Sequence, residues 1–171
     1  MYDGVSNDKL KQAITTWAKG ANDVIIYLIG HGGEGRFRIN ETETLKSSDL
    51  GLWLNTLQQS ISGMIIVVYD ACNSGSFLSD LKPPTGKRRI NITSTASDES
   101  AYFVGNGTIS FSYPFWSQVF NGATVYQAFA TAQDVVNFTW SQPPTLDDNG
   151  NGIGNEVDDD DLAEHTQLVR G

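Results

Sequence analysis

Cysteine is almost absent from this sequence of 171 residues, which contains only Cys72. A disulfide within the chain and a metal site built from several cysteines are therefore both excluded. Histidine is also scarce, with two residues. A lone cysteine is either a buried packing residue or a nucleophile. No apolar run approaches the roughly 20 residues that cross a bilayer, so we expect no membrane partner.

Basic residues are few, with 11 Lys and Arg against 20 Asp and Glu, and the net charge is -9. Residues 147–161 hold seven acidic residues and no basic one, which leaves a net charge of -2 for the rest of the chain. A nearly neutral body argues against binding to nucleic acid, which requires a basic face. The acidic segment raises the question of which cation it could hold.

The length, and a composition with 39% hydrophobic residues, fit a single domain with its own core, spanning residues 1–171. Short apolar runs alternate with segments of helical periodicity. Strands are predicted at 23–30, 64–69 and 88–95 with a hairpin arm at 35–40, and helices at 7–20, 47–59, 111–122 and 124–136. This alternation predicts an α/β fold, a three-layer sandwich with a mostly parallel sheet. In such a sheet we expect the strand at 23–30 to be buried on both faces.

Two of the predicted strands end in residues that can carry chemistry. The stretch "IIYLIGHGGEG" leads to His31, and "IIVVYDACNSGS" leads to Cys72. These strands are consecutive and joined by a helix, so their carboxyl ends should meet at the edge of the sheet where sites form. A histidine can activate a thiol for attack on a peptide bond. The backbone N–H groups of Gly32 and Cys72 are candidate donors to the oxyanion. The combined pattern predicts a cysteine peptidase with His31, Cys72 and Gly32 as catalytic residues.

The segments "LIGHGG" and "VYDACNSGSF" resemble the two catalytic motifs of the legumain-type cysteine peptidases. These peptidases belong to the caspase, metacaspase, clostripain and gingipain assemblage. The resemblance covers residues 8 to 140 approximately and is strongest to bacterial members. It implies a caspase-haemoglobinase-like fold, His31 as general base or acid, and Cys72 as the nucleophile that forms a thioester acyl-enzyme. It implies no cofactor for this chemistry.

The resemblance also implies where the side chain before the scissile bond is held. The family has an acidic residue two positions before the nucleophile, here Asp70, and this residue reaches the specificity pocket. The segment "ITSTASDESAYF" resembles the strand and loop that line that pocket, and Ser97, Asp98 and Ser100 are candidates for its wall. An ordinary solvated loop is the alternative for Asp98. An acidic pocket predicts cleavage after Asn or a basic residue.

The start of the chain departs from the resembled family. The family core begins with a strand and a helix upstream of the first helix predicted here, so we expect this chain to lack that N-terminal strand and helix. The loss would leave an edge of the sheet exposed, and such an edge favours self-association. The first residues, "MYDGVSNDKL", do not form a signal peptide, and the compartment stays open.

The acidic segment contains "DDNGNGIGNEVD", whose spacing partly matches a twelve-residue EF-hand loop. Candidate calcium ligands occupy positions 1, 3, 5, 7 and 12 of this loop: Asp147, Asn149, Asn151, the carbonyl of Ile153, and Asp158. The loop departs from the pattern because position 12 is Asp rather than Glu and no helix clearly flanks it. Calcium binding and a solvated acidic loop both stay open.

The sequence therefore predicts a cysteine endopeptidase that acts on peptide or protein substrates. Two alternatives are compatible with the same motifs. One is a catalytically silent binding or assembly domain of a larger protein, stabilised by calcium. The other is transamidation or ligation, which the same acyl-enzyme permits when an amine competes with water.

Overall fold

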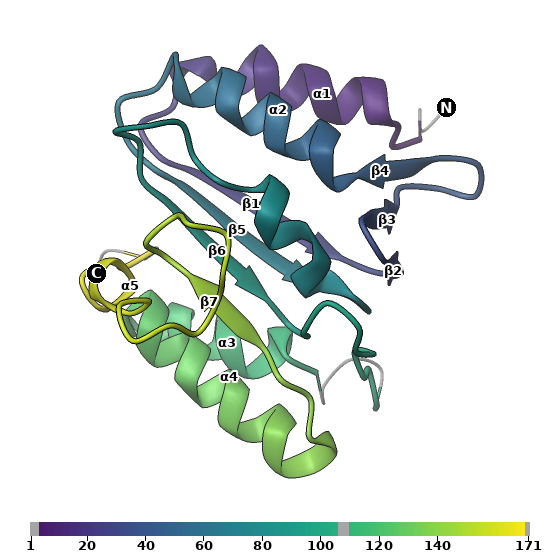
Figure 1. Cartoon of the computed structure of the whole chain (residues 1–171), viewed down its shortest axis with the longest axis vertical. Helices are drawn as coiled ribbons and strands as arrows, with labels where there is room; N and C mark the ends of the chain where they lie inside the picture. The colour runs from purple at the N-terminus through teal and green to yellow at the C-terminus, as the bar shows by residue number, and fades with distance from the viewer. Residues whose placement is uncertain (1–3, 106–109, 170–171) are drawn as a thin grey trace.

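A computed structural model describes residues 4–105 and 110–169, and its centre is a sheet with helices on both faces (Figure 1). The sheet has the strand order β1-β5-β6-β7. Its strands are β1 (Val24–Ile29), β5 (Ile65–Asp70), β6 (Arg89–Thr93) and β7 (Thr145–Asp147). Strands β1, β5 and β6 are parallel to one another, and β7 is antiparallel to β6. The predicted three-layer α/β sandwich with a mostly parallel sheet is confirmed.

One face of the sheet is covered by α1 (Asn7–Thr15) and α2 (Ser47–Gln58). Their buried residues pack against the inward-facing side chains of β5, and this core comprises Ile14, Leu50, Trp53, Leu54, Leu57, Ile65, Val67 and Tyr69. The predicted first helix is shorter than expected. It ends at Thr15, and the short 3-10 helix η1 (Trp17–Gly20) follows. Because the chain turns at this point, Trp17 is 85% exposed instead of joining the core.

The opposite face is covered by α3 (Ser112–Phe120) and α4 (Val125–Trp140). Helix α4 begins with a capping box, in which Thr124 accepts from the Gln127 amide and the Gln127 side chain accepts from the Thr124 amide. The apolar residues that recur at helical spacing in this segment are all buried: Val125, Ala128, Phe129, Ala132 and Val136.

In the described part of the chain, no helix combines the length and apolar character needed to span a membrane.

Strand β1 lies at the edge of the sheet and pairs with β5 alone among the described strands. On the face toward α3, Ile25, Tyr27 and Ile29 are 43%, 40% and 47% exposed. The prediction that this strand is buried on both faces is therefore wrong. Tyr27 packs edge-on against Trp116 of α3, but among the described residues no strand pairs with the free edge of β1. The side chains on this face therefore stay partly exposed.

A second, smaller sheet stands beyond the carboxyl end of β1. It consists of β2 (Gly32–Gly33), β3 (Arg36–Arg38) and β4 (Thr44–Lys46), all antiparallel. Phe37 and Leu45 from this sheet join the core on the α2 side. The predicted hairpin arm thus exists, and it anchors the segment that follows His31.

Candidate active site

The register of the sheet brings the two predicted catalytic segments together. Ile29 at the end of β1 is the register partner of Asp70 at the end of β5. The Gly30 amide donates to the Asp70 carbonyl at 3.2 Å, which continues the pairing by one residue. His31 and Cys72 each follow two residues after these partners. His31 and Cys72 therefore lie at equivalent positions just beyond the ends of two neighbouring strands.

The backbone at Gly32 lies directly against Cys72. A Cβ atom added to Gly32 would lie 2.1 Å from the Cys72 carbonyl oxygen and 2.9 Å from the Ala71 Cβ. Such separations are far below van der Waals contact, so only glycine fits this position. The glycine after His31 therefore allows the two motifs to approach each other.

His31 and Cys72 open onto the same cavity, which has a volume of about 460 Å³. The cavity is lined by Ile29, Gly30, His31, Cys72, Ala101 and Phe103. His31 is exposed and Cys72 is half-buried. The Cys72 thiol lies 3.9 Å from the Ala101 carbonyl oxygen and can donate to it. A substrate in this cavity would meet both side chains.

In the part of the chain that the structure describes, neither of the two backbone amides predicted as oxyanion donors makes a hydrogen bond within the fold. The Arg38 amide donates to the His31 carbonyl at 2.9 Å. Gly32 and Phe37 form the next pair of this antiparallel ladder, and such pairs alternate between bonded and non-bonded. The Gly32 amide therefore points away from β3. Among the described residues, no hydrogen bond reaches the Cys72 amide.

The segment after Cys72 is held by the loop that follows β6. Asn73 has a left-handed backbone with φ 56°. Its amide donates to the Glu99 carbonyl at 2.8 Å, and its side-chain amide donates to the Ser97 carbonyl at 3.0 Å. The 3-10 helix η2 (Ser74–Asp80) then begins. Cys72 is thus presented on a tight turn between a strand and a helix.

Ser76 is a site residue that the sequence analysis missed. Its hydroxyl donates to the Asn73 carbonyl at 2.5 Å and accepts from the Gly35 amide at 2.9 Å. One side chain therefore joins the segment after Cys72 to the segment after His31. The signal for it was the run of small polar residues after the cysteine, since short hydroxyl side chains often bind nearby backbone groups.

Asp70 is fully buried beneath the start of α3. Its Oδ2 accepts from the Ser112 amide at 3.0 Å and from the Ser112 hydroxyl at 2.5 Å. Its Oδ1 has no hydrogen-bond partner among the described residues. Burial raises the pKa of Asp70, and the hydrogen bonds from Ser112 together with the nearby Ser94 hydroxyl partly oppose that rise.

The other predicted pocket residues lie on the exposed loop after β6. Ser97, Asp98 and Ser100 are all exposed, and Ser97 contributes the carbonyl that binds Asn73. The structure does not bring them together with Asp70 in one cavity of the described residues. Their role in binding substrate stays a prediction.

The predicted calcium loop follows β7 and is closed by its own backbone amides. Asp147 is fully buried, and its carboxylate accepts from the Gly150 amide at 2.8 Å and from the Gly152 amide at 3.1 Å. Asn149 and Asn151 accept from amides two residues further on, Asn151 and Ile153. Within the described residues, no group of three or more His, Cys, Asp or Glu side chains is placed to hold a metal ion. Calcium binding stays a prediction.

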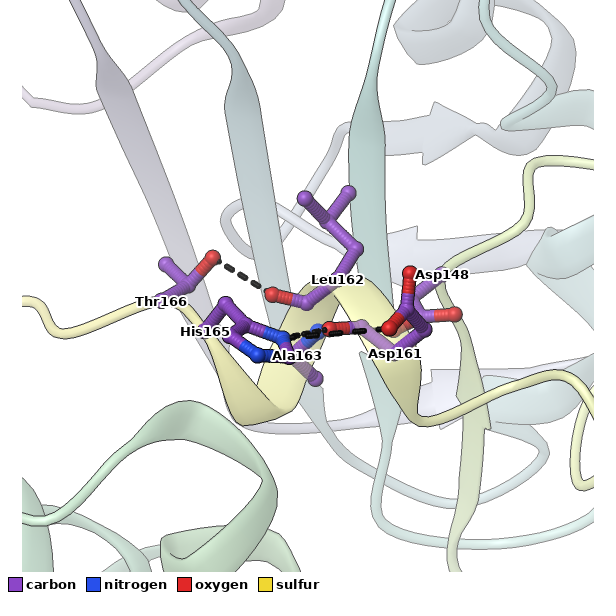
Figure 2. Close-up of polar contacts among 6 residues, drawn as sticks. All are labelled: Asp148, Asp161, Leu162, Ala163, His165 and Thr166. Atoms are coloured by element: carbon purple, nitrogen blue, oxygen red, sulfur yellow. Dashed lines mark hydrogen bonds and ion pairs between the residues drawn. The ribbon is translucent and has the colours of Figure 1, made fainter.

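Asp159, rather than the predicted ligand Asp158, directs its carboxylate toward the backbone of this loop. Asp158 is exposed. Asp159 accepts from the Glu156 amide at 2.8 Å and from the Asp148 amide at 3.3 Å. Asp148 in turn accepts from the Ala163 amide at 2.7 Å, at the start of the short helix α5 (Asp161–Glu164), as Figure 2 shows. These contacts fold the acidic segment into a compact unit.

The second histidine is remote from the cavity lined by His31 and Cys72. His165 is exposed at the end of α5, and its Nδ1 lies 2.7 Å from the Asp161 carbonyl oxygen (Figure 2). This hydrogen bond raises the pKa of His165. His165 faces a cavity at the amino ends of β1 and β5, the end of the sheet opposite to Cys72.

Comparison with known proteins identifies the family and the fold of the chain. The family model of the Peptidase C13 family matches residues 5–136. Among solved structures, caspase-1 from Spodoptera frugiperda has a similar fold, with a TM-score of 0.59 and 12% sequence identity. The match covers 83% of this chain and 66% of the caspase chain. None of the curated proteins that were compared matches this sequence. The fold is thus caspase-like, and the chain belongs to the Peptidase C13 family, the legumain family of cysteine peptidases.

Proposed function

We propose that this chain is a cysteine endopeptidase that uses a His31–Cys72 dyad. The observation that carries the proposal is the register of β1 with β5, which delivers both residues to one cavity. No cofactor takes part in the proposed chemistry.

The proposed reaction begins when His31 accepts the thiol proton of Cys72 and the sulfur attacks the carbonyl carbon of the scissile bond. The amides of Gly32 and Cys72 donate to the oxyanion of the tetrahedral intermediate. When the C–N bond breaks, the leaving amine takes the proton from His31 and a thioester remains. Water then attacks the thioester, again with His31 as the base, and the free acid and the Cys72 thiol are released.

We further propose cleavage after Asn or a basic residue. The support is Asp70, whose Oδ1 is buried and accepts no hydrogen bond from the described residues. A buried acceptor in this state is costly, and an amide or cationic group of a substrate would satisfy it. The exposed Ser97, Asp98 and Ser100 would form the outer wall of this pocket.

The experiment that tests the function is cleavage of a fluorogenic peptide panel varied at the residue before the scissile bond, with Asn, Asp, Arg, Lys and Ala. Each peptide is tested with and without calcium, and beside the Cys72→Ala variant. Cleavage that depends on Cys72 supports the peptidase. Binding of the same peptides without turnover would favour a silent binding domain. Aminolysis products in the presence of an added amine would favour transamidation.

We also propose that the chain associates with itself through β1. This edge strand has the sequence VIIYLI, with no charged residue, proline or bulge to protect it. An antiparallel pair of β1 strands centred on Tyr27 would place Ile25 against Ile29 of the second copy. The apolar side chains of the two strands would then lie side by side on one continuous sheet.

A further inference from the structure

A second cavity adjoins the catalytic residues and has a volume of about 500 Å³. The residues of its lining that matter here are Glu34, Gly35, Ser47, Ser76, Asp80 and Ser97. We refer to it as the polar groove. Glu34 follows His31 by three residues, and Ser76 follows Cys72 by four. The polar groove is therefore lined by the segments that follow both proposed catalytic residues.

The polar groove and the catalytic cavity lie on opposite faces of the end of the sheet. The catalytic cavity includes Ile29, which shares its face of β1 with Tyr27, the residue that packs on α3. The polar groove includes Ser47, the first residue of α2 on the other face. The closely packed backbones of Gly32 and Cys72 stand between the two. A peptide that crosses Cys72 would therefore enter one cavity with each of its halves.

The walls of the polar groove are tied to one another. The Ser47 hydroxyl donates to Asp80 Oδ2 at 2.5 Å, and the Ser47 amide donates to the Gly35 carbonyl at 3.0 Å. The Gly35 amide donates to Ser76 at 2.9 Å. The turn after His31, the start of α2 and helix η2 thus form one frame. A groove with fixed walls binds a peptide without a large ordering cost.

The charge of the polar groove has one sign. Of the described residues that line it, two are charged, and both are acids, Glu34 and Asp80. Both are exposed. Within the described residues, no hydrogen bond or ion pair is formed by the Glu34 carboxylate or by Asp80 Oδ1. These carboxylate oxygens can accept hydrogen bonds from a Lys or Arg side chain of a peptide, and their negative charge favours such a cation.

We propose that the polar groove binds the peptide segment that follows the scissile bond, and that Glu34 and Asp80 select a basic residue there. This inference rests on the proposed function, which assigns the residue before the scissile bond to the Asp70 face. The opposite face is then left for the leaving-group segment. Selectivity of this kind would act on the segment that leaves as the amine, and so would be independent of the pocket formed by Asp70.

The test uses internally quenched peptides with Asn before the scissile bond and two Lys, two Ala or two Glu residues after it. We expect the wild-type chain to cleave the Lys peptide with a kcat/KM roughly three- to tenfold above that of the Glu peptide, as exposed charge pairs allow. The double variant Glu34→Gln/Asp80→Asn should reduce this ratio to about one, again within the range of exposed pairs. The matched control is Glu41→Gln/Asp134→Asn, which removes two exposed acids outside the polar groove. It should leave the ratio unchanged.

A binding measurement separates this inference from the proposed peptidase. The affinity of the same peptides for the Cys72→Ala chain is measured by fluorescence anisotropy, with and without Glu34→Gln. This substitution breaks no side-chain hydrogen bond among the described residues. The polar groove is supported if the Lys peptide binds more tightly than the other two and if this preference weakens in the Glu34→Gln variant. This result would stand even if the wild-type chain cleaved no peptide and the peptidase proposal failed. Cleavage without any preference among the three peptides overturns the polar groove and leaves the peptidase standing. Equal binding of all three peptides together with no cleavage overturns both.

Discussion

The backbone of Gly32 packs against the carbonyl group of Cys72 so closely that a Cβ atom would lie 2.1 Å from the Cys72 oxygen. The residue next to the proposed base and the proposed nucleophile are thus in direct backbone contact. The catalytic arrangement depends on the absence of one methyl group, because any side chain at Gly32 would push the two motifs apart.

Gly32→Ala should therefore damage activity and stability together. We expect a loss of about 2 kcal/mol in the free energy of unfolding, as for other overpacked sites, and at least a tenfold lower kcat/KM. Urea unfolding and peptide hydrolysis measure the two effects. Gly33→Ala is the control, since a Cβ there meets nothing within 4 Å. Equal behaviour of the two variants would contradict the proposed contact.

Replacement of His31 should remove catalysis and leave the fold intact, because this side chain is exposed. For His31→Gln we expect kcat/KM to fall roughly 10²- to 10⁴-fold, the range of general acid–base catalysis. The circular dichroism spectrum should not change. His165→Gln changes the other histidine, which lies at the opposite end of the sheet, and should retain full activity. An active His31→Gln variant would rule out the dyad.

The stability of the chain should fall as the pH rises above about 4. Burial raises the pKa of Asp70 and of Asp147 above the ordinary value of 3.8. A group whose pKa is raised in the folded state contributes stability that is complete below 3.8 and is lost as the pH passes through the raised pKa. Urea unfolding between pH 4 and pH 8 approximately covers this window. Asp70→Asn should flatten the dependence of the free energy of unfolding on pH. The exposed control Asp134→Asn should leave this dependence unchanged. A profile of Asp70→Asn parallel to that of the wild type would contradict the assignment.

Calcium should bind the loop at 147–158 weakly, with a Kd of about 10⁻⁴ to 10⁻³ M, as expected for a site with two neutral Asn ligands. Binding should raise the melting temperature, and the effect should grow with pH because the metal requires ionised Asp147. Calorimetry and thermal unfolding measure both, with magnesium as the comparison ion. Asp147→Asn should abolish the effect. The absence of heat and of a melting shift at millimolar calcium would exclude the site.

Self-association through β1 should appear as a sedimentation coefficient that rises with protein concentration. Tyr27→Lys places a charge in the middle of the exposed strand face and should keep the chain monomeric. Phe138→Lys is the matched control, since Phe138 is 96% exposed and lies on α4 rather than on β1. A wild-type chain that stays monomeric across the micromolar range would refute the association.

Local patterns predicted the regular parts of this fold well. Helix α4 follows the capping box and the apolar spacing of its sequence, and β5 is as fully buried as its uninterrupted apolar run indicates. Parallel β5 and β1 then account for the meeting of His31 with Cys72, because consecutive parallel strands end at the same edge. The predicted cysteine peptidase family followed from these two strand ends.

Sequence patterns did not predict features that depend on contacts with distant segments of the chain. The apolar run of β1 cannot reveal that its outer side has no strand beside it in the described residues. Strand β7 has three residues and joins β6 from far along the chain, so no periodicity marks it. The role of Ser76 arises from a turn 41 residues away in the sequence. Such contacts exist only once the chain has folded.

The hydroxyl of Ser76 has a mechanical consequence. Because it binds both the Asn73 carbonyl and the Gly35 amide, the two catalytic turns are coupled and should move as one body. Separation of these two turns would first require the hydrogen bonds of Ser76 to break. A change in the flexibility of one turn would be transmitted to the other through a single side chain.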